Sequence, residues 1–467
     1  MIIVAQDANV RIRQSMLIYN ANIITSGSQN SVLNNHAIYV EDGLVSDLGL
    51  DSQLLSKYPT AEKLDAEGQY LMPGNICAHT HFYGAFARGI AIPGPAPRDF
   101  PEILKRLWWP LDKALDEESV RLSAQVHLVD AIRNGTTTLI DHHASPNFID
   151  GSLDVIGEMV DQSGLRAVLC YEVTDRDGDS KAKTGIRENV RFMERIRKDK
   201  PADGRLAGTF GLHASLTLSD ETLEQCRTAL PNESGFHIHV AEHEADQEDS
   251  LAKSGLRVVP RLAKYGILGP RTIAAHAVHV DTAEIEMLAE SSTWVSHQPR
   301  SNMNNGLGAA DIEALTAAGV NVCLGNDGFT QDMWAEWKAA YLLHKVWHRD
   351  PRKMNGADLA KIAVQYNSEL VGQFFPGAPI GEISLGARAD LILVDYHPHT
   401  PVTADNLPWH VIFGFQERML TMTMVDGQVL MRDRKLETLD EEEIAAKARE
   451  IAPQVWERYA QDAQQAI

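Results

Sequence analysis

Residues 69–81 read QYLMPGNICAHTH, an apolar run that ends in two histidines separated by one residue. Residues two apart in an extended strand point to the same side, so the imidazoles of His79 and His81 converge. Two neutral imidazoles are half of a zinc or iron site. The pair alone is a weak signal in a chain with 18 histidines. It gains weight because later strand-like runs end in further polar residues, namely His239 with Glu242 close behind, His276 and Asp327.

From residue 69 onward, apolar strand-like runs alternate with stretches of helical periodicity. This alternation is typical of βα units and a parallel sheet. The chain has eight such runs, which predicts an α/β protein built on a (β/α)8 barrel of the TIM type. They cover residues 70–81, 137–142, 166–172, 206–213, 235–241, 272–276, 293–296 and 320–327. In this fold catalytic groups lie at the carboxyl ends of the strands, which is where the candidate residues fall.

Both ends of the chain have β character outside this repeat. Residues 16–68 contain short apolar segments joined by turns, and residues 381–396 and 421–436 return to the same pattern. We therefore expect a small β-sandwich domain formed by both ends of the chain, with residues 1–68 as its N-terminal part and 376–467 as its C-terminal part. The barrel is expected over residues 69–375. The acidic segment from Asp440 onward predicts a terminal helix.

Composition narrows the class of protein. The net charge of −21 argues against nucleic acid and anionic membranes as partners, because both would repel the chain. Four scattered cysteines without metal-type spacing are typical of buried free thiols in a reducing compartment. The first residues lack the pattern of a secretory signal, and no run reaches the roughly 18 uncharged apolar residues that a membrane helix needs. We expect a soluble, cytoplasmic protein.

The candidate residues support hydrolytic metal chemistry. The expected ligands of one divalent ion, zinc first and iron as the alternative, are three imidazoles and one carboxylate: His79, His81, His239 and Asp327. Such an ion lowers the pKa of its water towards about 7. Glu242, three residues after His239, is placed to take a proton from water and deliver it to a leaving nitrogen. His276 would orient the water or stabilise charge, and Asp327 could take the first water proton.

Several neighbouring residues have a structural interpretation. Strand alternation puts His237 on the side of His239 but one layer deeper, so we interpret it as structural. The charged run 244–249 is interpreted as a solvated loop face. His142 and His143, which follow the second strand, stay open between substrate contact and a structural role.

The pocket is expected to be shaped by βα loops, above all residues 82–110 and 143–150. The proline-rich segment 89–100 predicts a semi-rigid loop over the barrel mouth, which Phe82 and a ring of Trp108 or Trp109 could line. Asn302 could read the edge of a heterocycle or could simply form a turn.

The strings PGNICAHTH, HIHVAEHE, AAHAVH, PRSNMNNG and LGNDG, in this order, resemble the amidohydrolase superfamily. More narrowly, they resemble its branch of cytosine, guanine and adenosyl-nucleoside deaminases and triazine hydrolases. The strings LCYEVTDRDG and FPEILKRLWWPLD are similar to the aminohydrolases called SsnA. The resemblance spans essentially the whole chain. It implies the ligand set and the proton shuttle given above, a water-contacting role for His276, substrate contact by His213, and a homo-oligomer.

The chain departs from the binuclear members of that superfamily, which bridge two metals with a carboxylated lysine. The third and fourth strand-like regions, LRAVLCYEVTD and RLAGTFGLHAS, contain no lysine, so one metal ion is expected. The favoured function is hydrolytic deamination of a small amino-substituted N-heterocycle of purine, pterin, pyrimidine or triazine type. A ring-opening amidohydrolase, or a triazine hydrolase releasing halide or alkylamine, would use the same site. A catalytically silent barrel serving as an assembly partner is the third reading.

Overall fold

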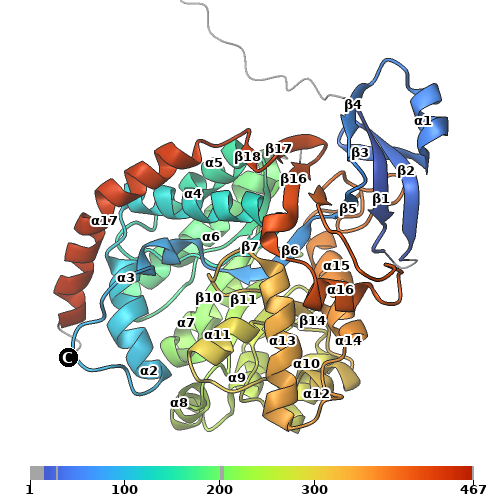
Figure 1. The fold of residues 1–467 in the computed structure, drawn as a ribbon. Helices are drawn as coiled ribbons and strands as arrows, with labels where there is room; N and C mark the ends of the chain where they lie inside the picture. Colours follow the sequence, from blue (N-terminus) through green and yellow to red (C-terminus); the bar gives the residue numbers. More distant parts are fainter. Residues whose placement is uncertain (1–14, 28–29, 200–203, 465–467) are drawn as a thin grey trace, which may run out of the picture.

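The computed structural model describes residues 15–27, 30–199 and 204–464. Its centre is a barrel of parallel strands surrounded by helices (Figure 1). The first three barrel strands are β6 (Asn75–Thr80), β7 (Thr136–Asp141) and β8 (Arg166–Leu169). The fourth consists of β9 (Leu206–Gly208) and β10 (Phe210–Ala214). The remaining four are β11 (Phe236–Val240), β12 (Ile273–His276), β13 (Trp294–His297) and β14 (Val322–Leu324).

The barrel closes between its last and first strands. Neighbouring strands pair in parallel from β6 to β9 and from β10 to β14. Past the break at Thr209, the amide of His213 donates to the carbonyl of Val173 (3.0 Å), which joins the third strand region to the fourth. The amides of Asn326 and Asp327 both donate to the carbonyl of His79 (2.9 and 3.1 Å). A Cβ at Gly325 would lie 2.7 Å from the backbone of His79, so only glycine allows this approach.

The second sheet has nine strands and is built from both ends of the chain. Its order is β18-β17-β16-β15-β5-β1-β2-β3, with β4 paired to β1. The N-terminal strands are β1 (Met16–Ile24), β2 (Val32–Glu41), β3 (Leu44–Leu50), β4 (Glu62–Asp65) and β5 (Tyr70–Pro73). The C-terminal strands are β15 (Leu391–Val394), β16 (Leu420–Val425), β17 (Gln428–Arg432) and β18 (Lys435–Leu436). Buried residues from both groups share one apolar cluster, which includes Ile18, Ile38, Leu391 and Met424.

One predicted strand is in fact two. Residues 70–81 were expected to form a single barrel strand, but β5 pairs with β1 and β15 in the nine-stranded sheet, and only β6 belongs to the barrel. The chain changes sheets at Gly74, where a Cβ would lie 2.2 Å from the Thr137 side chain. The amide of Gly74 donates to the carbonyl of Asp390 (2.9 Å). The two sheets are therefore joined directly at the strand that leads to His79.

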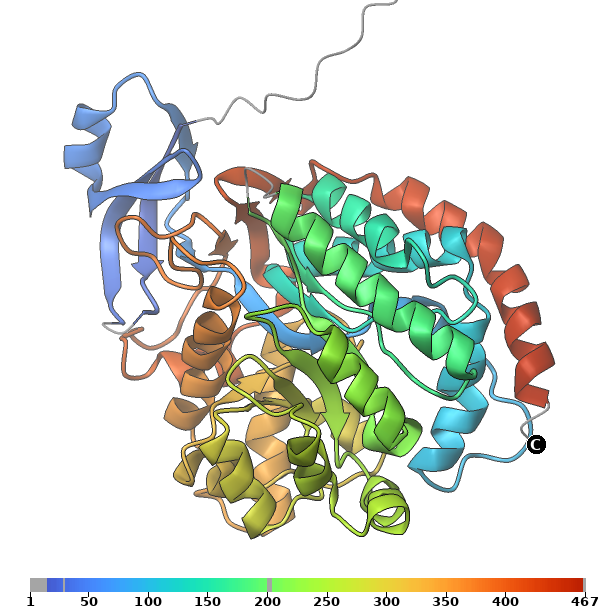
Figure 2. The same ribbon diagram turned by 180° about the vertical axis from the view of Figure 1, so that it is seen from behind.

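Helices cover the outside of the barrel on the faces seen in Figures 1 and 2. In the first half of the chain, α1 (Asp51–Lys57) packs on β1–β3 and not on the barrel. It is followed by α2 (Phe100–Ile103), α3 (Trp109–Lys113), α4 (Glu117–Arg133), α5 (Ser152–Ser163), α6 (Asp179–Asp199) and α7 (Asp220–Ala229). The second half contains α8 (Glu244–Ser254), α9 (Val258–Lys264), α10 (Thr282–Glu290), α11 (Pro299–Asn304), α12 (Ile312–Ala317), α13 (Met333–His348), α14 (Gly356–Ala360), α15 (Asn367–Gly372), α16 (Leu407–Phe413) and α17 (Glu441–Ala463). Two π-helical segments, 104–108 and 361–366, extend α2 and α14.

The terminal helix α17 begins where the sequence predicts it, after the capping Asp440, whose side chain accepts from the amide of Glu443. It runs along α3 and α4 on the barrel, far from the N-terminal strands (Figure 1). The charged run 244–249 was expected to be a solvated loop face; Glu244 and Glu248 are exposed, but the run is helical and not a loop. It forms the start of α8, and the buried carboxylate of Asp246 accepts from the amides of Ala241 (2.9 Å) and Leu216 (2.8 Å).

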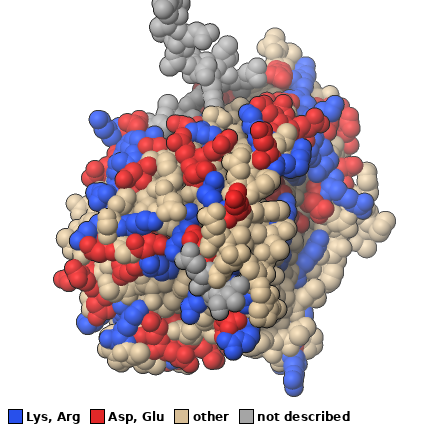
Figure 3. All heavy atoms as spheres, turned by 90° about the vertical axis from the view of Figure 1, so that its left-hand side faces the viewer, with Lys and Arg blue, Asp and Glu red and all other residues tan. Residues whose placement is uncertain are grey.

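The surface carries charged side chains of both signs. On the face shown in Figure 3, Lys and Arg side chains are interleaved with Asp and Glu side chains. Among the described residues, no helix combines the length and apolar character needed to cross a membrane. All four cysteines are buried and free, as expected.

Candidate metal and catalytic site

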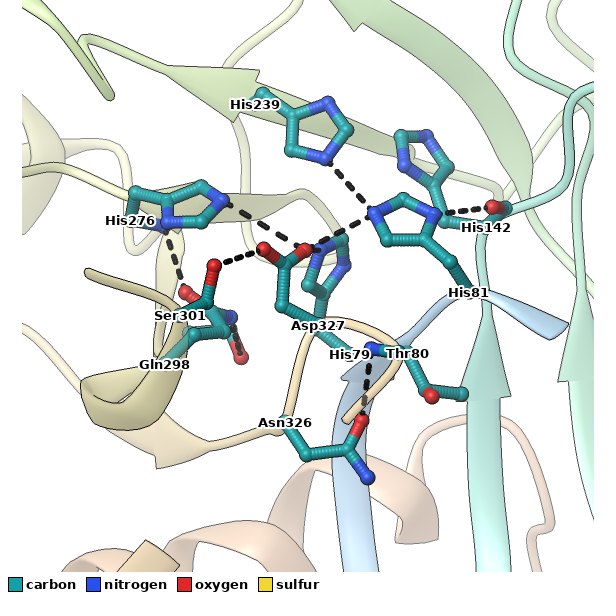
Figure 4. Close-up of polar contacts among 12 residues, drawn as sticks. His79, Thr80, His81, His142, His239, His276, Gln298, Ser301, Asn326 and Asp327 are labelled. Atoms are coloured by element: carbon teal, nitrogen blue, oxygen red, sulfur yellow. Dashed lines mark hydrogen bonds and ion pairs between the residues drawn. The ribbon is translucent and has the colours of Figure 1, made fainter. Parts of the chain in front are cut away.

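Five polar side chains from four different strands meet at one end of the barrel (Figure 4). His79 lies in β6 and His81 directly after it, His239 lies in β11, His276 ends β12, and Asp327 follows β14. The parallel strands bring their carboxyl ends to the same edge, which explains why residues so distant in sequence converge. We call His79, His81, His239, His276 and Asp327 the donor cluster.

The carboxylate of Asp327 is the centre of the donor cluster. Its Oδ1 lies 2.9 Å from His79 Nε2, 3.0 Å from His81 Nε2 and 3.9 Å from His276 Nε2. His239 Nε2 lies 3.3 Å from His81 Nε2. The other oxygen of Asp327 accepts from the hydroxyl of Ser301 (2.5 Å). Burial opposes the charge of Asp327, but the surrounding imidazoles, with His276 first, hold its pKa well below the usual range.

The tautomers of two imidazoles follow from their partners. His81 Nδ1 lies 2.6 Å from the carbonyl oxygen of His142, and His239 Nδ1 lies 2.8 Å from that of His213. A carbonyl only accepts, so both Nδ1 atoms carry the proton, and in the neutral imidazoles both Nε2 atoms carry lone pairs. These lone pairs face each other and the Asp327 carboxylate. Three acceptors at such distances repel one another unless a cation lies among them, so the donor cluster fits Zn²⁺ or Fe²⁺.

Glu242 and His276 stand beside the donor cluster. Glu242 Oε1 lies 3.6 Å from His276 Nε2, and that nitrogen is buried without a hydrogen-bond partner among the described residues. Burial, then the nearby Asp327 carboxylate, raises the pKa of Glu242 well above its usual range. His276 and Asp327 have positive φ angles of 73° and 58°, which non-glycine residues adopt where the surrounding structure imposes them.

A cavity opens from this site; the space within it and its open mouth together is about 770 Å³. Its inner end is lined by His81, His239, Glu242 and Asp327, and its sides include His213 and Glu172. Burial raises the pKa of Glu172 to about 8 against the opposing effect of His81. The outer wall consists of aromatic and charged residues, namely Tyr83, Phe100, Trp108, Trp109, Asp112 and Arg176. We call these six residues the outer wall.

An ion pair is built into the outer wall. Arg176 Nη2 donates to Asp112 Oδ2 (2.9 Å), and the guanidinium lies 5.0 Å from the Trp109 ring centroid. Burial raises the pKa of Asp112 to about 6, although Arg176 opposes the shift. Within the part of the chain that the structure describes, Arg176 Nη1, Asp112 Oδ1 and Trp109 Nε1 have no hydrogen-bond partner.

The structure places the three expected substrate-binding residues differently. His213 lines the cavity, with its Nδ1 2.7 Å from Thr217 Oγ1. Phe82 lies outside the cavity lining, because a 3-10 helix begins there and its ring stacks on His127 (5.9 Å). Its neighbour Tyr83 takes the position expected for Phe82. Asn302 is buried and its Oδ1 lies 2.9 Å from His276 Nδ1, so it contacts a donor-cluster residue and not the cavity.

Sequence reasoning left the polar part of the outer wall out of the site. Asp112 and Arg176 lie 64 residues apart, and no spacing rule links them. Glu172 also lines the cavity, with its Oε1 3.4 Å from His81 Nδ1. His142, which was left open, contacts the donor cluster through its backbone carbonyl and does not line the cavity. The position of Glu172 just past a barrel strand was the one signal available.

Known proteins resemble this chain over most of its length. Residues 70–430 match the profile of the Amidohydrolase family. The chain is 32% identical over 432 residues to a 5'-deoxyadenosine deaminase of Methanobrevibacter smithii, covering 90% of this chain and 94% of the relative. It is 32% identical over 403 residues to a 5-methylthioadenosine/S-adenosylhomocysteine deaminase of Haloarcula marismortui, covering 85% and 89%.

Solved structures agree in fold. An adenosine deaminase from Xanthomonas campestris with bound zinc superimposes with a TM-score of 0.82 at 25% identity, covering 95% of this chain and 98% of that one. A zinc complex of an atrazine chlorohydrolase from Arthrobacter aurescens gives a TM-score of 0.78 at 21% identity, covering 94% and 100%. The resemblance expected from the strand-end motifs is confirmed: this chain belongs to the amidohydrolase family.

Proposed function

We propose that this protein is a metal-dependent hydrolase that removes an amino group from an N-heterocycle of purine-nucleoside type, releasing ammonia. The observation that carries the proposal is the donor cluster with Glu242 beside it at the inner end of the cavity. The sequence relatives described above as deaminases of 5'-deoxyadenosine and 5-methylthioadenosine support the choice of leaving group and ring.

The proposed metal ligands are those of the sequence analysis: His79, His81, His239 and Asp327. We propose one divalent ion per chain, zinc first and iron as the alternative, because imidazole and carboxylate ligands suit both metals. The zinc-bound adenosine deaminase with the same fold favours zinc. When bound, such an ion acts as a Lewis acid that makes water a nucleophile at neutral pH.

Glu242 is the proposed proton carrier. Its buried carboxyl lines the inner end of the cavity, and burial raises its pKa, which makes the carboxylate a stronger base. It takes a proton from the attacking water and gives it to the departing amino nitrogen, so that the carbon–nitrogen bond breaks and ammonia leaves. His276 gives its Nδ1 proton to the amide oxygen of Asn302 and presents the lone pair of Nε2 to the same space, where it can accept a hydrogen bond from the attacking water and orient it.

The residues of the outer wall are suited to bind a flat heterocycle. Its aromatic rings offer flat apolar surface for a ring system, and His213 presents an imidazole from the cavity side. The Arg176–Asp112 pair cancels its own charge, so this wall suits a substrate without a net charge.

Ammonia release by zinc-loaded protein tests the proposal, with metal quantified on the same sample. The panel contains 5'-deoxyadenosine, 5'-methylthioadenosine, adenosine, guanine, cytosine, a pterin and chlorinated and alkylamino triazines. Ammonia from the adenine nucleosides at one metal per chain is the expected result. Halide, alkylamine or a ring-opened product without ammonia would replace deamination by the alternative reactions of the same site. A metal-loaded chain that turns over nothing would contradict the proposed enzyme.

We also propose a homo-oligomer. Four large apolar side chains, Leu342, Val346 and Trp347 on α13 and Phe413 on α16, are 56–77% exposed on two helices that pack together. Such exposed apolar clusters are typical of protein interfaces. Light scattering on the eluting protein would give the mass directly, and a mass of one chain, 51.6 kDa, would contradict the proposal.

A further inference from the structure

The three imidazoles proposed as ligands are held in two different ways. His81 and His239 each give their Nδ1 proton to a backbone carbonyl, which no substitution removes. His79 has no such carbonyl partner at its Nδ1 among the described residues. Its Nδ1 instead lies 2.8 Å from Nε2 of a second buried imidazole, His237, which the sequence analysis interpreted as structural.

His237 is itself held by a buried set of partners. It has no exposed surface, and the ring of His142 stacks on it with centroids 4.4 Å apart. Its Nδ1 lies 3.9 Å from the sulfur of Cys170, within reach of a hydrogen bond to sulfur. The Cys170 thiol in turn lies 3.4 Å from the carbonyl oxygen of Asp141. Both Cys170 and His142 are fully buried.

In this series of hydrogen bonds, the direction of donation is fixed at every step. The carbonyl of Asp141 only accepts, so the Cys170 thiol donates to it and the sulfur is left as an acceptor. The sulfur then accepts from His237 Nδ1–H. A neutral His237 with its proton on Nδ1 has a lone pair on Nε2, which accepts from His79 Nδ1–H. This series of hydrogen bonds therefore leaves the lone pair of His79 on Nε2, the atom that faces the donor cluster.

The opposite tautomer of His79 is also available locally. With its proton on Nε2, His79 would donate to Asp327 Oδ1 at 2.9 Å and could not bind a metal through that atom. The geometry points to His237 as the positioning residue that selects between these two tautomers, with Cys170 orienting His237. This inference rests on the proposed metal site and assigns His237 no contact with substrate.

The inference is tested by the zinc affinity of the wild type and of three variants, His237→Gln, His237→Asn and His237→Leu. The affinity is measured by competition with a chromophoric chelator. His237→Gln keeps an amide oxygen where Nε2 lies, whereas the amide of His237→Asn reaches only the Nδ1 side. His237→Leu has no acceptor. We expect His237→Asn and His237→Leu to bind Zn²⁺ about 10- to 100-fold more weakly, the range typical of lost partners behind metal ligands, and His237→Gln to bind within a few-fold of the wild type.

The controls separate the possible failures. Thermal denaturation of the metal-free proteins shows which variants fold, and the Gln–Asn comparison is matched in polarity, so it decides the question even if His237→Leu does not fold. The visible spectrum of the Co²⁺-loaded proteins reports ligand geometry and should change in His237→Asn but not in His237→Gln. Equal zinc affinity and equal spectra in all variants would overturn the role of His237 alone. A wild-type chain that binds no Zn²⁺ would instead overturn the metal site and the proposed function.

Discussion

The donor cluster and the outer wall lie in the same cavity but are built in opposite ways. Each residue of the donor cluster lies at or next to the end of a barrel strand, and close partners on neighbouring strands or in the loop after them, such as the backbone carbonyls beside His81 and His239, fix its position. The outer wall is carried mainly by the long segment between β6 and α4, and it is fixed by contacts from elsewhere in the chain. The comparison indicates that the donor cluster carries the chemistry and that the outer wall sets the substrate. Changes in the first should lower kcat, and changes in the second should raise KM or lower stability.

The largest effect is expected at the proton carrier. Glu242→Gln keeps the size of the side chain but removes its ability to carry a proton, so kcat should fall by about 100- to 10,000-fold, the contribution typical of general acid–base catalysis. Because Glu242 is not a proposed ligand, the metal content should not change. Steady-state kinetics and metal analysis on the same preparation measure both quantities.

Glu244→Gln is a matched control for this variant. It makes the same substitution two residues along the chain, where the side chain is 74% exposed on α8. It should behave as the wild type. If Glu242→Gln kept its turnover and its metal, Glu242 would not be the proton carrier. The division of the cavity into a catalytic end and a substrate-binding end would then also be wrong.

The next effect is expected at the ion pair of the outer wall. Arg176→Met leaves the buried Asp112 carboxylate without its cation, which should lower the free energy of unfolding by about 3–5 kcal/mol. The double variant Arg176→Met with Asp112→Leu removes both charges and should recover much of that loss. Urea denaturation of the two proteins measures the difference. Equal stability of the single variant and the wild type would show that the pair is more hydrated than its 9% and 2% exposed side chains indicate.

The same contrast explains what could be predicted from sequence. The donor cluster follows from two local rules, the alternation of side chains along a strand and the convergence of strand ends in a barrel, so His79, His81 and Asp327 could be placed together in advance. Phe82 was misplaced because alternation ends where a 3-10 helix begins. The Asp112–Arg176 pair is a contact between helix α3 and the segment after β8, and no periodic pattern encodes it.

A smaller effect is expected one contact away from the donor cluster. The Ser301 hydroxyl donates to Asp327 Oδ2 at 2.5 Å and so fixes the carboxylate that the imidazoles surround. Ser301→Ala should weaken zinc binding by about 10-fold, the lower end of the range for partners behind metal ligands. Chelator competition measures it, and Ser301→Thr, which keeps the hydroxyl, is the control. Unchanged affinity in Ser301→Ala would show that the backbone alone holds Asp327.

The smallest effect is expected far from the reaction, at the helix that supports the outer wall. The hydroxyl of Tyr459 in α17 donates to the carbonyl of Arg106 at 2.7 Å, and the guanidinium of Arg106 donates to the carbonyls of Pro93 and Pro95. Tyr459→Phe removes one buried hydrogen bond, worth about 1 kcal/mol, from the segment that carries Trp108. KM should rise about five-fold with kcat unchanged, because the reacting groups lie on the barrel and the loosened segment only binds.

Glu457→Gln, an exposed substitution on the same helix, should leave both constants unchanged. If Tyr459→Phe lowered kcat as much as it raised KM, the outer wall would take part in positioning the reacting atoms. The two ends of the cavity would then not have separate roles in catalysis and in substrate binding. A rise in KM alone would instead show that α17 affects substrate binding and not the chemical step. This helix touches neither the substrate nor the donor cluster, because the hydrogen bond from Tyr459 reaches the cavity only through the backbone of Arg106.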